Sequence, residues 1–103
     1  MKDRIKGKKV SLIKFPNKLD GFYIISSIND ARPIGFFGIK NNEVVGLYLE
    51  EEYRNRGYGT EVIKLIKENF DNLYLITHLD NLAMQHILEK LGYSRYLKYE
   101  VKK

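Results

Sequence analysis

The stretch from Glu50 to Glu61 constrains the fold of this chain more than any other segment. A short, apolar and β-branched run at 43–49 comes before it and is typical of a buried strand. After it, apolar residues recur at helical spacing with charged residues between them, at Val62, Ile63, Leu65, Ile66 and Phe70. The stretch is therefore predicted to be a turn that leads from a strand into a helix.

Two glycines, Gly57 and Gly59, are placed at the mouth of that predicted helix. The first turn of a helix has N–H groups without a partner inside the helix, and it carries a partial positive charge. Glycine lets a ligand approach the backbone closely, and Arg54 and Arg56 add full positive charges beside it. The pattern predicts a site for a phosphate or pyrophosphate group.

Two motifs in this chain resemble those of a known family. Residues Arg54–Gly59 fit the pattern Arg/Gln-x-x-Gly-x-Gly/Ala. Asn81-Leu82-Ala83, followed by Leu91-Gly92-Tyr93, fits a second pattern, and a predicted strand at Leu73–Thr77 lies between the two motifs. Together they resemble the GNAT superfamily of acetyl-CoA-dependent N-acetyltransferases over residues 34–93. The bound nucleotide is then expected to be acetyl-CoA.

The composition limits the classes of protein that remain. The 103 residues, 44% of them hydrophobic, suit one folded domain spanning residues 1–103. The chain has no cysteine, which excludes a disulfide scaffold, a thiolate zinc site and an acyl-cysteine intermediate, so the transfer is direct or uses another nucleophile. Direct transfer is the expectation, and no metal is expected. No apolar run approaches the length of a membrane span, and no secretory leader is recognisable. A cytoplasmic location is the expectation.

The net charge of +5 is concentrated near the two ends of the sequence. Three interpretations remain open for this basic surface: a solvated face, a contribution to binding the anionic cofactor, and nucleic-acid binding through phosphates. The chain shows no recognition helix, zinc spacing or RNA-binding aromatic signature. Nucleic-acid binding is therefore the weaker alternative.

The order of predicted elements agrees with the fold that the resemblance implies. Strands are predicted at 9–15, 22–28, 34–40, 43–49, 73–77 and 93–101, with helices after the fourth and fifth. Asn41-Asn42 predicts a tight hairpin, since asparagine tolerates positive φ angles. The expected fold class is α+β, or mixed α/β, with a mostly antiparallel GNAT-like sheet and two main helices.

The chain departs from the family between its first two predicted strands. Members carry one or two helices there that form much of the acceptor site, whereas here only residues 16–21 are available. The N-terminal helices are therefore expected to be reduced or absent. Either the acceptor cleft is open and suits a large substrate such as a protein, or a second subunit supplies the missing wall. The single predicted strand after Tyr93 also favours a homodimer.

Acetylation of an amine requires a group that removes a proton. A lysine-like amine has a pKa of about 10.4, so it is protonated at neutral pH and unreactive. Glu43 lies eleven residues before Arg54, and the resemblance to histone-acetyltransferase-like members assigns the catalytic glutamate to this offset. Glu43 is the candidate base, directly or through a water. The alternative is an exposed glutamate beside a hairpin.

The resemblance also assigns the residues that hold the cofactor. Backbone N–H groups of Leu47, Tyr48 and Leu49 would bind the pantetheine arm and polarise the thioester carbonyl. The backbone around the pyrophosphate would come from Arg54, Asn55, Arg56, Gly57, Tyr58, Gly59 and Thr60. The resemblance makes Asn81 a pantetheine ligand or a backbone anchor. The sequence alone makes Asn81 or Asp80 the N-cap of the following helix, and both roles can hold at once.

The usual acid of the family is missing. Members protonate the leaving thiolate from a tyrosine seven residues after the asparagine, and Leu88 occupies that position here. His86 would face another side of the helix, so His78, near a strand end, is the better placed candidate acid. Tyr48, Tyr74 and Tyr93 stay open as candidates without a positional argument. His78 has the alternative of an ordinary surface histidine, and the thiolate could also leave unassisted.

The sequence as a whole predicts an N-acetyltransferase that moves the acetyl group of acetyl-CoA to an amine, with a protein amine favoured over a small molecule. The expected partners are acetyl-CoA, the acceptor and a second copy of the chain, with no membrane. The competing hypotheses are an acyl-CoA sensor or basic interaction module without turnover, and a nucleic-acid-binding protein.

Overall fold

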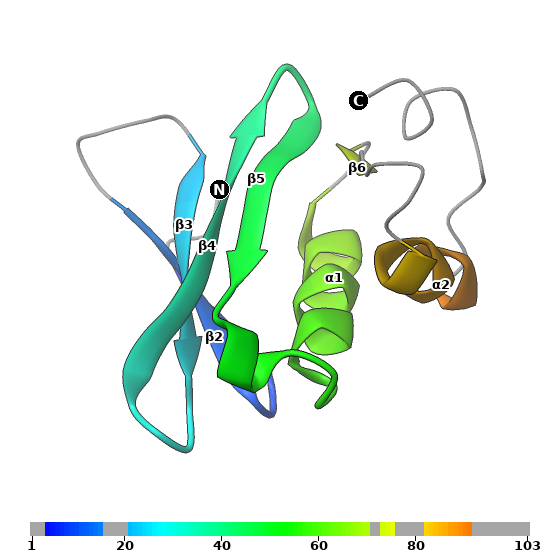
Figure 1. Cartoon of the computed structure of the whole chain (residues 1–103). Helices are drawn as coiled ribbons and strands as arrows, with labels where there is room; N and C mark the ends of the chain where they lie inside the picture. The colour runs from blue at the N-terminus through cyan, green and yellow to red at the C-terminus, as the bar shows by residue number, and fades with distance from the viewer. Residues whose placement is uncertain (1–3, 16–20, 71–72, 76–81, 92–103) are drawn as a thin grey trace.

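A computed structural model describes residues 4–15, 21–70, 73–75 and 82–91 of the chain. Within these residues a six-stranded sheet runs in sequence order, and helices stand beside it (Figure 1). The strands are β1 (Arg4–Lys6), β2 (Val10–Lys14), β3 (Phe22–Ser27), β4 (Arg32–Lys40), β5 (Glu43–Leu49) and β6 (Tyr74–Leu75). The helices are the short 3₁₀ helix η1 (Glu51–Tyr53), α1 (Tyr58–Asn69) and α2 (Leu82–Lys90).

The sheet is mostly antiparallel, which confirms the predicted fold class. Strands β1 to β5 pair antiparallel with their neighbours, and β6 pairs parallel with β5. Asn41 and Asn42 have φ angles of 53° and 64°, so the β4–β5 turn uses the positive φ angles predicted for it. Strand β1 was not predicted, because its three residues carry too little hydrophobic pattern to be recognised.

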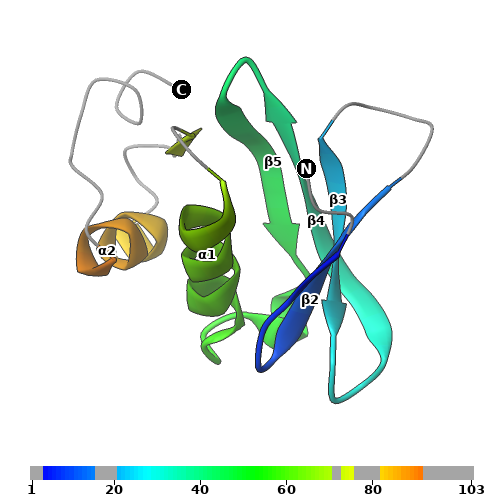
Figure 2. The same ribbon diagram turned by 180° about the vertical axis from the view of Figure 1, so that it is seen from behind.

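Helix α1 packs its apolar stripe against one face of the sheet. The buried residues of α1 are Tyr58, Val62, Ile63, Leu65 and Ile66, and the helical spacing predicted the last four of them. Phe70, also predicted from the spacing, is half-buried and follows the end of the helix. They meet the inward-facing side chains of the strands, among them Leu12, Tyr23 and Phe37, which are fully buried. Burying a side chain of this size stabilises the fold by roughly 1.5–3 kcal/mol, so this interface provides the main core. Seen from behind, α1 stands between the sheet and α2 (Figure 2).

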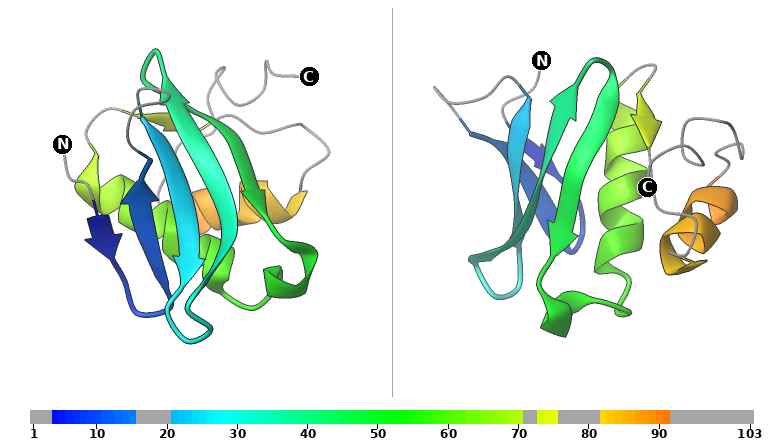
Figure 3. Two further views of the ribbon diagram at one scale, coloured as in Figure 1. Left: turned by 90° about the vertical axis from the view of Figure 1, so that its left-hand side faces the viewer. Right: turned by 45° about the horizontal axis from the view of Figure 1, so that its top comes forward.

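The other face of the sheet is not covered by either helix. In the left view of Figure 3, β1 to β5 lie in front and both helices lie behind them. Between β2 and β3, the amide of Phe15 donates to the carbonyl of Phe22 at 2.8 Å, so pairing extends to the ends of the short 16–21 connection. Residues 16–20 lie outside the described residues, so the expected lack of N-terminal helices between these two strands stays a prediction.

Some predicted features lie outside the described residues. These are the strand at 93–101 and the two candidate site residues His78 and Asn81. In the part of the chain that the structure describes, no helix is long and apolar enough to cross a membrane.

Candidate functional site

Strand β5 contains a bulge just before its end. Gly38 pairs with Val45, and Phe36 pairs with Tyr48, so β5 uses one more residue than β4 between these two pairs. Gly46 takes a φ of 63°, a left-handed conformation that glycine adopts without strain. A bulge leaves one residue without a regular ladder partner, so backbone groups near Leu47 are available to a ligand.

The loop from Arg54 to Gly57 leads directly into α1. Asn55 and Gly57 have φ angles of 59° and 86°, and both residue types tolerate this region. Gly57 is the N-cap residue of α1, and no side chain caps this end of the helix. The first N–H groups of α1 therefore point out of the helix with its partial positive charge, a suitable arrangement for an anion.

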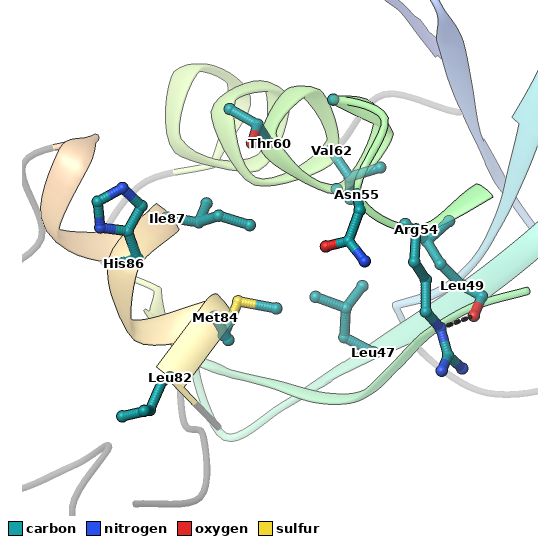
Figure 4. Close-up of a pocket in the computed structure, with 12 residues that line it drawn as sticks. Leu47, Leu49, Arg54, Asn55, Thr60, Val62, Leu82, Met84, His86 and Ile87 are labelled. Atoms are coloured by element: carbon teal, nitrogen blue, oxygen red, sulfur yellow. Dashed lines mark hydrogen bonds between the residues drawn. The ribbon is translucent and has the colours of Figure 1, made fainter. Parts of the chain in front are cut away.

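A cavity of about 730 Å³ lies between the end of β5, the start of α1 and helix α2 (Figure 4). This volume is in the range of small-molecule binding sites. The lining side chains from β5 and α2 are mostly apolar, and the polar ones come from the loop and the first turn of α1. The cavity is lined by Leu47, Leu49, Arg54, Asn55, Gly57, Gly59, Thr60, Val62, Leu82, Met84, His86 and Ile87.

Gly59 keeps the middle of this cavity open. A Cβ atom at Gly59 would lie 3.6 Å from Leu49 Cδ1 and 4.0 Å from Ile87 Cδ1. Any side chain larger than a methyl group would therefore extend between β5 and α2. Gly59, the second glycine of the motif, is needed because it leaves this space open. Gly57 is needed because the N-cap position has a positive φ angle, which glycine adopts without strain.

Three cations surround the start of α1. Arg54 donates from Nε to the carbonyl of Leu49 at 2.8 Å, and its guanidinium lies over the Tyr48 ring at 5.4 Å. Arg56 donates to the carbonyl of Glu52 at 2.8 Å. Lys9 lies over the ring of Tyr58 at 5.1 Å, and Arg56 lies over the same ring at 5.5 Å. These charges add to the helix terminus in attracting an anion.

An ionic and tyrosyl cluster anchors the loop to the β3–β4 turn. Tyr53, buried in η1, donates its hydroxyl hydrogen to the carboxylate of Asp30. Arg32 donates to the Tyr53 hydroxyl at 3.1 Å and to Glu50 at 3.0 Å. The hydrogen bond to Asp30 raises the pKa of the Tyr53 hydroxyl, and the hydrogen bonds to Tyr53 and Glu50 raise the pKa of Arg32. The cluster fixes where the loop begins.

The structure brings most of the predicted cofactor residues together. The cavity is lined by Leu47, Leu49, Arg54, Asn55, Gly57, Gly59 and Thr60. Tyr48 lies on the other face of the sheet, opposite Phe36, while Arg56 and Tyr58 pack against each other beside the loop. These last three residues do not line the cavity.

Sequence reasoning missed the contribution of the second helix to the cavity. Met84, Ile87, Leu88 and Leu91 recur at helical spacing, which predicts a buried stripe, yet Met84 and Ile87 are half-buried in the cavity wall. Leu82 and His86 also lie on α2 and line the cavity, and neither was predicted to do so. Figure 4 shows His86 at the side of the cavity opposite Arg54. A stripe that lines a cavity and one that fills a core have the same spacing, so the pattern alone could not separate them.

Glu43 lies outside the cavity, at the start of β5. Its register partners are Lys40 on β4 and Tyr74 on β6, and its side chain is half-buried. The described pairing of β5 with β6 covers only Glu43 and Val44. Gly46, at the bulge, lies three positions after Glu43, a distance of roughly 10 Å along a strand.

Leu88, at the position where the resemblance expects an acid, belongs to the core. Its side chain is 1% exposed and does not line the cavity. The described part of α2 thus directs an apolar side chain inward at this position.

Comparison with known proteins adds one finding. The model of the acetyltransferase (GNAT) family matches residues 6–93. No curated protein and no solved structure matches the chain.

Proposed function

Because the chain belongs to the acetyltransferase (GNAT) family, we propose that it is an N-acetyltransferase that moves the acetyl group of acetyl-CoA to an amine. The observation that carries this proposal is the cavity between the bulged end of β5, the uncapped start of α1 and the apolar face of α2. Its polar and apolar parts match the two chemical parts of acetyl-CoA, a charged nucleotide and a largely uncharged pantetheine arm.

We assign the diphosphate to the start of α1. Amides from Gly57 to Thr60 would donate to the phosphate oxygens, and Lys9, whose Nζ lies 3.9 Å from the position of a Cβ atom at Gly57, would add charge beside them. The pantetheine arm would lie between Leu49 and Ile87, in the space that Gly59 leaves open. Backbone donors at the bulge, near Leu47, would polarise the thioester carbonyl, a contribution typically worth about 3 kcal/mol.

The proposed reaction is direct transfer. Glu43 accepts the proton of the acceptor ammonium, through a water because of its distance from the bulge. The free amine then attacks the acetyl carbon, so that a C–N bond forms, the C–S bond breaks and the thiolate leaves. Leu88 cannot donate a proton, so the thiolate takes one from the product nitrogen or from solvent, unless His78 supplies it.

The acceptor is proposed to be the amine of a protein. The open face of the sheet suits a large substrate, because no described helix covers it. A homodimer remains the alternative source of a second wall for the acceptor site.

A sensor of acyl-CoA is the second candidate function. The observation that favours it is the burial of Leu88 where members of the family have an acid. A sensor would bind acetyl-CoA in the same cavity and release no thiol.

Glu43→Gln separates the two functions. The measurement is thiol release from acetyl-CoA with a pool of lysine-containing peptides, from pH 6 to 10. The enzyme should lose about 100-fold in kcat/KM at neutral pH, because the glutamine cannot accept a proton. Part of the rate should return as the pH approaches the amine pKa of about 10.4.

Glu51→Gln is the matched control, since it removes the same charge from an exposed position in η1. It should leave the rate within twofold of the wild type. Equal rates for Glu43→Gln and the wild type would remove Glu43 from the mechanism. A wild type that binds acetyl-CoA and releases no thiol with any peptide or small amine would establish the sensor instead.

A further inference from the structure

The outer side of the sheet carries a continuous apolar surface, here called the aromatic face. Residues that are direct partners in neighbouring strands point to the same side of a sheet. One such row crosses five strands, from Arg4 through Ile13, Ile24 and Phe36 to Tyr48. The face consists of this row's Ile13, Ile24, Phe36 and Tyr48 together with Phe15 and Phe22.

The four rings of the face touch one another in a chain. Phe15 and Phe22 have ring centroids 5.8 Å apart, Phe22 and Phe36 6.0 Å, and Phe36 and Tyr48 5.4 Å. Phe15, Phe36 and Tyr48 are 39%, 40% and 42% exposed. Contiguous exposed apolar surface of this kind marks an interaction site on a soluble protein.

We propose that the aromatic face docks the protein acceptor through an amphipathic, acidic segment. This inference rests on the proposed function, and it names the class of acceptor. The pairing of β4 with β5 places Glu43 on the same side of the sheet as the aromatic face. Gly38 and Lys40 lie two residues apart on this side of β4, and they are paired with Val45 and Glu43. A partner held on this face therefore comes close to the proposed base.

Charge selects an acidic occupant. Arg4 stands at one end of the row, with Lys6 two residues along β1, and the guanidinium of Arg54 covers the Tyr48 ring at the other end. A second copy of the chain, packed face to face around a twofold axis, would bring these cations against like charges. Carboxylates of a partner would instead complement both ends.

The dimensions of the row set the length of the segment. Five strands are separated by four gaps of about 4.8 Å, which gives roughly 19 Å. An α-helix rises 1.5 Å per residue, so about 13 residues would span the row. A helix of that length with apolar residues on one side and carboxylates at both ends fits the face.

The geometry of the rings disfavours nucleic acid. Phe22 and Phe36 are tilted by 32°, and Phe36 and Tyr48 by 28°, at contact distance. Their faces are thus partly occupied by one another, whereas base stacking needs a free ring face.

A pair of synthetic peptides tests the proposal. The first has 16 residues, leucines at helical spacing, glutamates at both ends and one central lysine, and its twin has glutamines in place of the glutamates. Binding is measured by fluorescence anisotropy without acetyl-CoA. The Kd of the protein for the acidic peptide should be at least tenfold lower than its Kd for the glutamine twin. Phe36→Gln should weaken that binding at least tenfold. With acetyl-CoA, the lysine of the bound peptide should become acetylated.

Arg4→Glu should reduce the preference for the acidic peptide. Lys64→Glu, the same charge change on the exposed side of α1, should leave it within twofold, which separates local from overall charge. The proposal is overturned if the two peptides bind equally, if Phe36→Gln binds like the wild type, or if Phe36→Gln dissociates a wild-type dimer. Single-stranded RNA that competes with the peptide would also overturn it. Acetyl-CoA binding is measured separately, so failure of the cofactor site remains distinguishable from failure of the docking face.

Discussion

Glu61 shows how one side chain in α1 holds a distant loop. Its Oε2 atom accepts hydrogen bonds from the backbone amides of Lys8 at 2.6 Å, Lys9 at 2.8 Å and Val10 at 3.3 Å. The carboxylate also lies in the first turn of α1, where negative charge is favourable. It thereby fixes Lys9 beside the anion site that we propose.

Glu61→Ala should lower the free energy of unfolding by about 1–3 kcal/mol, because three backbone donors, of which the Val10 amide is partly buried, lose a charged acceptor. Glu61→Gln should cost less, since one amide oxygen remains. The measurement is urea denaturation of the two variants and of Glu68→Ala, an exposed change on the same helix. A loss from Glu61→Ala no larger than that from Glu68→Ala would contradict the anchoring role.

Tyr53 predicts a dependence of stability on alkaline pH. Its hydroxyl pKa is raised above the usual value of 10.0, chiefly by the hydrogen bond to Asp30. Below about pH 10 both states keep the proton, and the stabilisation is complete. As the pH rises from 10 through the raised pKa, the unfolded chain ionises first, so the folded state loses stability.

Tyr53→Phe should therefore show a shallower fall in the free energy of unfolding between pH 9.5 and 11 than the wild type. Tyr48→Phe removes a tyrosine that is 42% exposed and serves as the control. The free energy of unfolding is measured by urea denaturation at each pH. Identical slopes against pH for Tyr53→Phe and the wild type would show that the Asp30 contact adds nothing to the pH dependence of stability.

At the scale of elements, the close approach of β4 to β5 depends on one glycine. A Cβ atom at Gly35 would collide with the carbonyl oxygen of Tyr48 and lie 3.1 Å from Leu49 Cα. At Gly38, three residues along the same strand, a Cβ atom would lie 3.4 Å from a Val45 methyl group, which is ordinary contact.

We expect Gly35→Ala to destabilise the protein by about 2–3 kcal/mol, because backbone atoms must move to admit the methyl group. Gly38→Ala should change the stability by no more than about 0.5 kcal/mol. Thermal unfolding of both variants provides the comparison. Equal losses would show that the pairing of β4 with β5 is looser than described.

Local patterns in the sequence were sufficient for the strand, loop and helix at the site. The short apolar, β-branched run at 43–49, the glycines of the loop and the helical stripe after it each reflect contacts between near neighbours, and β5 and α1 form where predicted. The contacts of Glu61 join residues 51 to 53 positions apart. Such pairs leave no local pattern, so this anchor could not be predicted.

The bulge and the aromatic face illustrate the same limit. Gly46 could be a weak point in a strand or a bulge, and only its register against β4 decides between them. Phe15 and Tyr48 belong to separate predicted strands, and the strand order shows that their rings end one continuous row of aromatic contacts. Prediction from spacing recognised the strands, whereas their common surface depends on the fold.

At the scale of the whole molecule, the sheet separates two tasks. Its inner face supports α1 and the cavity for the proposed cofactor, while its outer face bears the aromatic face and Glu43. The bulge lies in β5, between Glu43 on the outer face and the end of the strand that borders the cavity. The two substrates of the proposed reaction would thus approach β5 from opposite sides.

The most direct test of the account is calorimetric titration of acetyl-CoA into the wild type, Gly59→Leu and Lys64→Leu. Leucine favours helix, so both variants should fold, but only the side chain at position 59 extends between Leu49 and Ile87. We predict that the wild type and Lys64→Leu bind acetyl-CoA with equal affinity and that Gly59→Leu binds at least tenfold more weakly. A folded wild type that takes up no acetyl-CoA, or a Gly59→Leu variant that binds it equally well, would contradict the assignment of this cavity.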